Sequence, residues 1–509
     1  MNQDFSLRIQ VLEWVLSVLA IYFFAKPGVL PTRKIESSID LYVGLTCGFY
    51  FLLAFASKIL QFFCLKLHAQ DFWLFVDILE HAKHGEYFIT HFAPQAWGPV
   101  QHGAVHPFIP WAILAPFSIL FSPVAIALSF NPIVLALSGW VLDRIMKQLC
   151  LASVTRLCVV IAFLFSKQVR LTLMYEVHPE ALYPLISFSL ILCLIANRPV
   201  LGFVSAMTLG VLKVDSFLVL WGSFIASIAL QPSLLKHSFV RTIITFGIGL
   251  AGFFLQLKIV PYFVSHPLDA FVPKGSPIME GRNIDGVHSI FEIAQDLFSK
   301  NGGTSGTIGA FFGFLTSGSW LGLIRNAPWI TIKPAFWLSE LPLAFGFSLR
   351  GENAILWNYY SMPFVAFIWT FGASFLRGKP VRWSLAILIF SLTNGSEGVR
   401  LYFPNKELLD YRAEAKSFAE EIRSFEGVGV VSSNLIPFVP IHKVISDRLP
   451  ARSNDEAKVQ FYFLPKDRDQ YGLSAVQVND KVNKLSSNPE FQKVRESRTL
   501  VLFKRVNRG

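Results

Sequence analysis

The residues best suited to chemistry in this sequence are charges that interrupt apolar segments. Lys213 and Asp215 stand in the middle of an apolar run that extends from Val200 to Leu230. A charge at bilayer depth costs about 3 kcal/mol, so its presence there favours a function. A lysine in this place can bind a phosphate, with the aspartate as its partner or as a group that binds a second substrate. The alternative is a tight turn between two spans, in which both charges reach water.

Two His-Pro pairs form a second group of candidate residues. His106-Pro107 and His178-Pro179-Glu180 each stand immediately before an apolar run. Proline in a first helical turn and an acid beside it are ordinary at a helix N-terminus. Capping alone does not require histidine at both sites, and histidine is well suited to proton transfer and hydrogen bonding. Substrate binding by His106, His178 and Glu180 and a plain helix start both stay open.

Asp71 and Asp77 form a third group, directly after an apolar run. The spacing of Phe72, Phe75, Val76 and Leu79 predicts an interfacial helix. A carboxylate at the membrane surface can act as general base for a hydroxyl group. The alternative is that the two acids only cap a surface helix beside lipid headgroups.

Arg282 and Tyr359 complete the set of candidates. Arg282 lies in the Gly- and Ser-rich stretch Gly275 to Gly286, which suits either a mobile substrate lid or a plain flexible connection. Tyr359 lies at the start of a further apolar run, where it suits either a substrate contact or an aromatic belt at the membrane surface. The sequence contains no phosphate-loop or GxGxxG pattern that would decide between these readings.

The composition places these residues in a membrane protein. Of the 509 residues, 53% are hydrophobic and 16% are charged, and the mean hydropathy is +0.48. The apolar runs predict an all-α polytopic domain over residues 1–394, with roughly ten to twelve transmembrane helices. The stretch from Leu7 to Phe24 is predicted to be a retained membrane segment. The run from Leu157 to Tyr175 reads as one span, whereas Pro123 and Pro132 either divide another run into a hairpin or leave it as one tilted helix.

The charge pattern predicts the topology. The net charge of +11 comes from clusters between the apolar runs, which argues for membrane orientation and against nucleic acid. The clusters at Asp143 to Arg156, Lys236 to Arg241 and Arg377 to Arg382 are predicted to be cytoplasmic. The loops 68–106 and 265–307 and the tail are then extracytoplasmic. The five cysteines lie in or beside apolar runs and read as buried small side chains, neither a disulfide framework nor a metal site.

The tail, residues 395–509, reads as a small soluble α/β domain. Helices are predicted at Lys406 to Phe425 and Val478 to Leu485, and strands at Val428 to Val431 and Thr499 to Phe503. A further strand is predicted at Val439 to Ile445.

In order along the chain, several short motifs resemble a family of multispanning prokaryotic membrane proteins known as domain of unknown function 2079. The similar stretches are Gln70 to Phe75, His84 to Phe88, His106, Tyr175 to Glu180, Leu212 to Asp215 and Asn358 to Pro363. That family is similar in turn to the GT-C glycosyltransferase superfamily, whose members use polyprenyl-phosphate sugars. The sequence departs from the pattern at Val76, where the family has a second acid, and at Val214; Asp77 lies one position late.

The resemblance implies roles for the candidate residues. Asp71 takes the position of the catalytic base. Either Asp77 replaces the family's second acid from the next helix position, or this chain lacks the two-carboxylate mechanism, including metal binding. By the same resemblance, the residues that line one cavity are His106, His178, Glu180, Lys213 and Asp215. We further expect Tyr359 and Arg282 to contact substrate, and Lys213 or Arg282 to stabilise the departing phosphate.

The expected activity is an inverting sugar transfer at the outer face of the cytoplasmic (inner) membrane. The donor is a lipid-linked sugar and the acceptor is not indicated. A divalent metal ion is compatible with this chemistry but is not indicated by the sequence. Two alternatives remain, a transporter or lipid flippase, and a scaffold that kept the fold and lost catalysis.

Overall fold

The computed structural model describes most of the helical part and most of the tail. The described residues are 6–8, 34–67, 70–86, 89–90, 100–101, 113–174, 177–213, 216–265, 335, 338, 362–393, 400–446, 457–466 and 475–506. Asp71 is described only as part of a helix, without its side chain.

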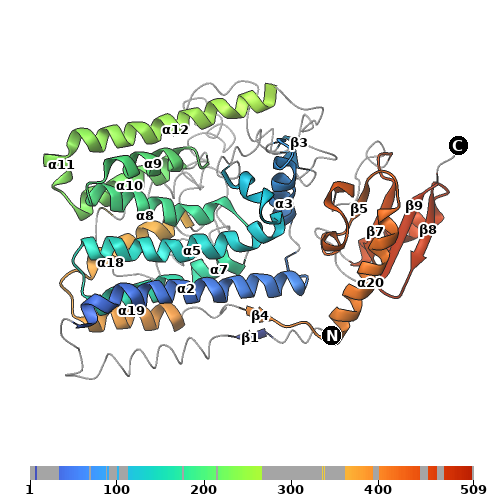
Figure 1. Ribbon diagram of the computed structural model, residues 1–509, viewed down its shortest axis with the longest axis horizontal. Coiled ribbons are helices and arrows are strands. Elements are labelled where there is room, and N and C mark those ends of the chain that lie inside the picture. Colours follow the sequence, from blue (N-terminus) through green and yellow to red (C-terminus); the bar gives the residue numbers. More distant parts are fainter. Residues whose placement is uncertain are drawn as a thin grey trace, which may run out of the picture.

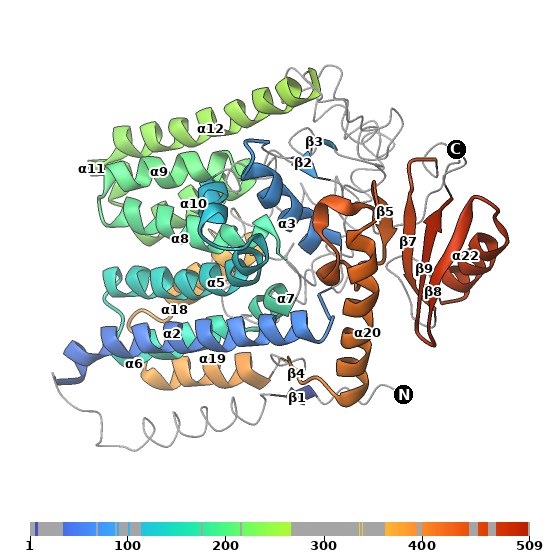
Figure 2. The ribbon, with the colours of Figure 1, turned by 45° about the vertical axis from the view of Figure 1, so that its right-hand side comes forward.

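Apolar helices packed side by side form the larger part of the structure (Figures 1 and 2). The long helix α5 packs against α2 and α8, and α9 packs closely against α12. Their inner faces bury one continuous apolar core that includes Leu142, Phe163 and Phe188. The helices are α2 (Lys34–Phe63), α5 (Pro123–Gln148), α6 (Ser153–Leu164), α8 (Leu182–Ile195), α9 (Pro199–Gly210), α10 (Ser216–Leu230), α12 (Phe239–Ser265), α18 (Met362–Phe375) and α19 (Val381–Thr393).

The outer faces of these helices are apolar too, as expected where lipid replaces water. Leu52 on α2 is 63% exposed and Val240 on α12 is 69% exposed. Among the described helices, three are long and apolar enough to cross a membrane, or four if the bent pair α6 and α7 (Lys167–Met174) counts as one span. This is fewer than the predicted ten to twelve. Four further apolar helices are shorter, with 10–17 residues.

Breaks inside the apolar runs explain part of this difference. The run from Leu157 to Tyr175 does not form one straight span, because α6 and α7 meet at an angle of 42°. The run from Val200 to Leu230 forms α9 and α10, separated by a turn at Lys213.

The two prolines of the earlier run have different effects. Pro123 is the first residue of α5. A backbone N–H at this position has no partner within the helix, so proline, which has no N–H, costs nothing here. The Ser122 hydroxyl caps the helix by accepting a hydrogen bond from the Ala125 amide. Pro132 lies inside the continuous α5. The chain therefore turns before Pro123, and Pro132 does not split the helix.

The tail contains a five-stranded sheet covered by a helix on each face (Figure 2). The strand order is β6-β5-β7-β9-β8, with β5 parallel to β6 and β7, and β9 antiparallel to β7 and β8. Because side chains alternate along a strand, Phe463 of β7 packs towards α20 (Lys406–Arg423), and Tyr462 shares the other apolar cluster with α22 (Ala475–Ser487). The strands are β5 (Gly429–Val431), β6 (Val444–Ser446), β7 (Phe461–Pro465), β8 (Phe491–Glu496) and β9 (Leu500–Arg505).

Most of the predicted tail elements are present with small shifts in their bounds. The predicted strand from Val439 to Ile445 is largely wrong, because 3-10 turns at Ile436–Phe438 and Ile441–Lys443 occupy this stretch and β6 begins only at Val444. Two strands of the five-stranded sheet, β7 and β8, were not predicted. All five residues of β7 are buried, so its sequence lacks the alternation that marks a half-exposed strand.

The start of the chain differs from the sequence prediction. Ser6–Arg8 forms the short strand β1, which pairs antiparallel with β4 (Arg400–Tyr402), just before α20. The predicted membrane segment from Leu7 to Phe24 therefore does not begin at Leu7. The rest of that segment lies outside the described residues.

The tail and the short helix α3 (Gln70–Ala82) lie at the same end of the helical bundle (Figures 1 and 2). Arg412 of α20 joins the tail to the bundle. Its Nη1 donates to the backbone oxygen of Phe63, the last residue of α2, at 2.9 Å. Its guanidinium also lies over the rings of Phe63 and Phe438, 5.2 Å from each centroid.

Candidate functional site

Glu180 is the centre of a buried charged cluster. Its side chain has no exposed surface, and its two oxygens bind different partners: Oε1 accepts from Nζ of Lys213, and Oε2 contacts Nδ1 of His178. Glu180 lies in the 3-10 turn Pro179–Ala181 that leads into α8, and Lys213 lies in the turn between α9 and α10. A helix start and a helix break thus bring together residues 33 positions apart.

This cluster bears on two alternatives left open by the sequence. The tight turn is present at Lys213, but this side chain is only 8% exposed and is paired with Glu180 rather than extended into water. Glu180 does more than favour a helix N-terminus, because it balances a buried cation. Breaking such a pair leaves an uncompensated charge, which is strongly unfavourable in an apolar core.

Helix α3 reaches this cluster through an aromatic contact. The ring of Phe75 meets the imidazole of His178 edge to face, with 6.3 Å between the centroids. Asp71 lies in the first turn of α3, one helical turn before Phe75. Residues four apart share a face of a helix, so the backbone of α3 carries Asp71 on the face that meets His178.

Asp77 is placed differently. It is buried, with 1% of its side chain exposed, and its Oδ1 lies 3.8 Å from Nε2 of His81, one turn further along α3. Nδ1 of His81 in turn contacts Glu86 at 2.6 Å. Asp77 follows Phe75 by two positions, which corresponds to the opposite side of a helix. Asp77 is thus in contact with His81 on its own helix.

The remaining candidates, His106, Asp215, Arg282 and Tyr359, lie outside the described residues. In the described part of the chain, no group of three or more His, Cys, Asp or Glu side chains is arranged to hold a metal ion. Four of the five cysteines are free and buried, but Cys150 is exposed, contrary to the prediction that all five are buried.

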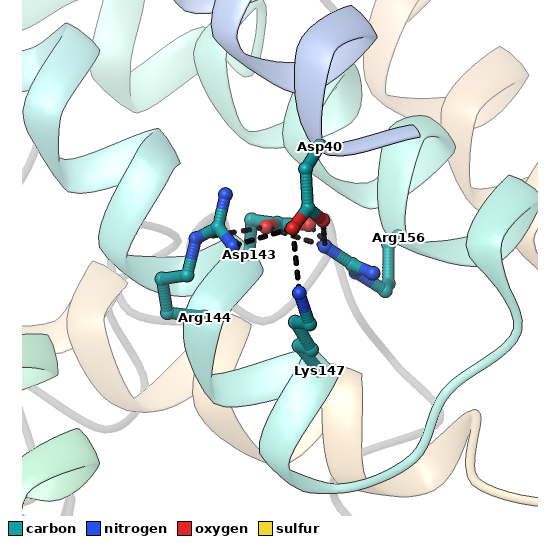
Figure 3. A network of polar contacts seen from close by, with 5 residues as sticks. All are labelled: Asp40, Asp143, Arg144, Lys147 and Arg156. Carbon is teal, nitrogen blue, oxygen red and sulfur yellow. Dashed lines mark hydrogen bonds and ion pairs between the residues drawn. The ribbon is translucent and has the colours of Figure 1, made fainter. Parts of the chain in front are cut away.

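Sequence reasoning missed a second charged cluster, at the opposite end of the bundle from α3 (Figure 3). Arg156 of α6 is 5% exposed and binds both acids: its Nη2 lies 2.6 Å from Asp40 and 2.7 Å from Asp143. Asp40 also accepts from Arg144 at 2.9 Å and from Lys147 at 2.5 Å. The basic residues of this segment led to the prediction that it is cytoplasmic. Their pairing with Asp40 could not be predicted, because Asp40 lies more than 100 positions earlier in the chain.

The whole arrangement is similar to that of a solved structure. The structure of ArnT from Cupriavidus metallidurans, bound to undecaprenyl phosphate, aligns with 91% of this chain and 98% of its own, with a TM-score of 0.50 and 10% sequence identity. The chain thus shares its fold with this structure. The structures it resembles are GT-C glycosyltransferases, which agrees, at the level of architecture only, with the GT-C-like fold expected from the motif order.

Two further GT-C structures match with lower scores. The arabinofuranosyltransferase AftD from Mycobacteria aligns with 91% of this chain and 40% of its own, at a TM-score of 0.47 and 12% identity. The oligosaccharyltransferase of Archaeoglobus fulgidus aligns with 86% of this chain and 70% of its own, at 0.45 and 12%. No family model and no curated protein matches the sequence, so the resemblance to domain of unknown function 2079 is not confirmed.

Proposed function

We propose that this protein is an inverting membrane glycosyltransferase that moves a sugar from a polyprenyl-phosphate donor to a hydroxyl acceptor. The observation that carries the proposal is the buried bridge from Lys213 through Glu180 to His178, facing α3. It places the ammonium group of Lys213 at the turn between α9 and α10, where it can bind a phosphate. The GT-C fold adds support, because the similar ArnT structure contains undecaprenyl phosphate.

The proposed reaction uses Asp71 as general base. Its carboxylate takes the proton of the acceptor hydroxyl while the acceptor oxygen bonds to the anomeric carbon of the sugar. The bond from that carbon to the phosphate oxygen breaks on the opposite face, which inverts the configuration. The polyprenyl phosphate leaves with the bonding electrons.

Lys213 stabilises the charge on the leaving phosphate. Its position depends on Glu180, which neutralises the ammonium group in the resting state and holds it near the turn between α9 and α10. His178 orients the sugar or the phosphate, and the contact with Phe75 sets the distance between His178 and α3. Roles for His106, Asp215, Arg282 and Tyr359 in the same cavity, and for Asp77 as a second carboxylate, remain part of the proposal.

The proposed location is the cytoplasmic membrane, with this site and the tail on the extracytoplasmic side. The basic segments at Asp143 to Arg156 and Arg377 to Arg382 lie at the other end of the bundle from α3 and the tail (Figure 1). Positive charges concentrate on the cytoplasmic side of membrane proteins. A lipid-linked donor can then expose its phosphate to the site while its isoprenoid chain stays in lipid.

The proposal is tested by incubating the purified full-length protein with a panel of radiolabelled polyprenyl-phosphate sugars. We expect one donor to lose its sugar, and we expect Asp71→Asn to lower the rate by at least about a hundredfold, as for other general bases. The control is Glu80→Gln, which removes an acid from the same helix where it pairs with Lys83 away from His178. Full activity of Asp71→Asn would show that the assigned base is wrong.

The same assay addresses the alternatives. Parallel reactions with EDTA test whether a divalent metal ion is required. A transporter or flippase would instead move labelled lipid between leaflets of proteoliposomes without releasing sugar. A scaffold would do neither.

A further inference from the structure

A second polar pocket lies at the end of the bundle opposite α3. It is a shallow recess, with a cavity volume of only about 10 Å³, where α8 ends and both α9 and α12 begin, beside the short helix α11 (Leu234–His237). Its walls combine apolar side chains with hydroxyl and guanidinium groups. The polar side chains of its lining include Asn197, Arg198, Ser238, Arg241 and Thr242.

The two arginines of this pocket differ from the basic residues of the cluster in Figure 3. There, Arg144, Lys147 and Arg156 are neutralised by Asp40 and Asp143. In the part of the chain that the structure describes, neither Arg198 nor Arg241 forms an ion pair with a carboxylate. Their positive charge is therefore available to an anion.

The pocket holds one of these charges in a defined position. The guanidinium of Arg241 donates to the side-chain oxygen of Asn197 and, at 3.1 Å, to the hydroxyl of Ser238. Asn197 adopts a left-handed backbone conformation, with φ of 58°, that ends α8 and turns the chain into α9. The N-termini of α9 and α12 add partial positive charge from their backbone dipoles.

The surroundings of the pocket indicate which anion fits. Large apolar side chains lie exposed on the first turns of both helices: Val200 is 70% exposed and Val204 is 58% exposed on α9, and Val240 is 69% exposed and Ile243 is 52% exposed on α12. A cationic pocket at the margin of an apolar surface matches a molecule with an anionic head and apolar chains. A free phosphate ion would use the pocket but not this apolar margin.

We propose that this pocket binds the phosphate of an anionic glycerophospholipid, with the acyl chains lying along the exposed apolar faces of α9 and α12. On the proposed topology the lipid comes from the cytoplasmic leaflet, whose anionic lipids attract basic groups. The pocket is separate from the Glu180 cluster and does not depend on glycosyltransferase activity.

The test measures lipid binding to the purified full-length protein in a zwitterionic detergent by native mass spectrometry. The probes are phosphatidylglycerol and phosphatidylcholine with identical acyl chains, and inorganic phosphate as competitor. We expect phosphatidylglycerol to be preferred, and each arginine to contribute roughly fivefold to its affinity. The variants are Arg198→Gln, which removes an exposed side chain, and the double variant R198Q/R241Q.

The matched control is Arg382→Gln, which removes an exposed charge near the start of α19 outside the pocket. Loss of the preference in the pocket variants, with Arg382→Gln unchanged, supports the site. The proposal is overturned if both lipids bind equally, if Arg382→Gln weakens binding as much, or if inorganic phosphate binds more tightly than the lipid. Because the Arg198 side chain is exposed, its single variant keeps the test valid even if the double variant misfolds.

Discussion

The ring of Phe75 stands almost perpendicular to the imidazole of His178, at an interplanar angle of 89°. This contact joins α3, which carries Asp71, to the cluster of Glu180 and Lys213. It is one of the contacts through which the position of α3 relative to Lys213 can affect the proposed reaction. The contact is therefore the first place to test the site.

Phe75→Leu should impair transfer more than stability. Leucine keeps most of the buried apolar volume, so we expect a stability loss below about 1.5 kcal/mol. The aromatic edge that positions His178 is lost, and small misplacements of reacting groups cost about tenfold or more in rate. The control is Phe72→Leu on the same helix, because Phe72 packs against Phe62 and Trp73. Equal loss of rate in both variants would count against a positioning role.

Lys213 and Glu180 should behave as a coupled pair in stability measurements. Lys213→Met leaves the fully buried Glu180 without its cation, and we expect it to cost about 3 kcal/mol. The double variant Lys213→Met with Glu180→Gln should recover most of this loss, as measured by thermal unfolding in detergent. If transfer stays absent in the stable double variant, the lysine acts in the reaction and not only in folding. Additive stability losses would contradict the pairing.

Arg156 and Arg144 should differ sharply in their contribution to stability. Arg156 is buried and binds Asp143, whose side chain has no exposed surface, so Arg156→Met should cost about 3 to 5 kcal/mol. Arg144 is 23% exposed and contacts the more exposed Asp40, so Arg144→Met should cost at most about 1 kcal/mol. Thermal unfolding of the two variants provides the comparison. Similar losses would mean that burial does not govern this network.

Arg412 should hold the tail domain against α2. Burial lowers the pKa of its guanidinium, yet the group is stabilised by the Phe63 carbonyl and by two aromatic rings. Arg412→Ala should weaken docking by about 2 kcal/mol, seen as faster hydrogen exchange at the C-terminal end of α2 and in α20. Arg423→Ala, at an exposed position of the same helix, should leave exchange unchanged.

Native Cys150 offers a direct test of orientation. It is exposed in the turn between α5 and α6, beside the basic cluster, whereas the other four cysteines are buried. In intact cells a membrane-impermeant thiol reagent should leave Cys150 unlabelled, and in inverted vesicles it should label it. With Cys150→Ser, a cysteine introduced at exposed Ser487 of the tail should show the reverse pattern. Labelling of both positions from one side would reject the proposed topology.

The sequence by itself determined the local elements whose signals are contained within a few neighbouring residues. Apolar runs predicted most of the membrane helices, the Ser122-Pro123 pair marks the start of α5, and the amphipathic pattern after Asn405 predicted α20 almost to the residue. The same patterns predicted the type of the tail domain. Each of these features depends on hydrophobic periodicity or capping, which act over short distances along the chain.

Only the tertiary structure decided which charges meet. From spacing alone we expect Lys213 to pair with its neighbour Asp215, which lies outside the described residues. In the structure Lys213 binds Glu180, and Arg156 binds Asp40 from 116 positions away. The bend after α6 and the buried strand β7 were likewise missed. A segment that is apolar on every side shows no alternation of apolar and polar residues, so its sequence does not indicate which face is buried or against what. In an apolar interior a charge is stable only beside its counter-charge, so the packing of helix breaks, and not spacing in the sequence, selects the members of the candidate site.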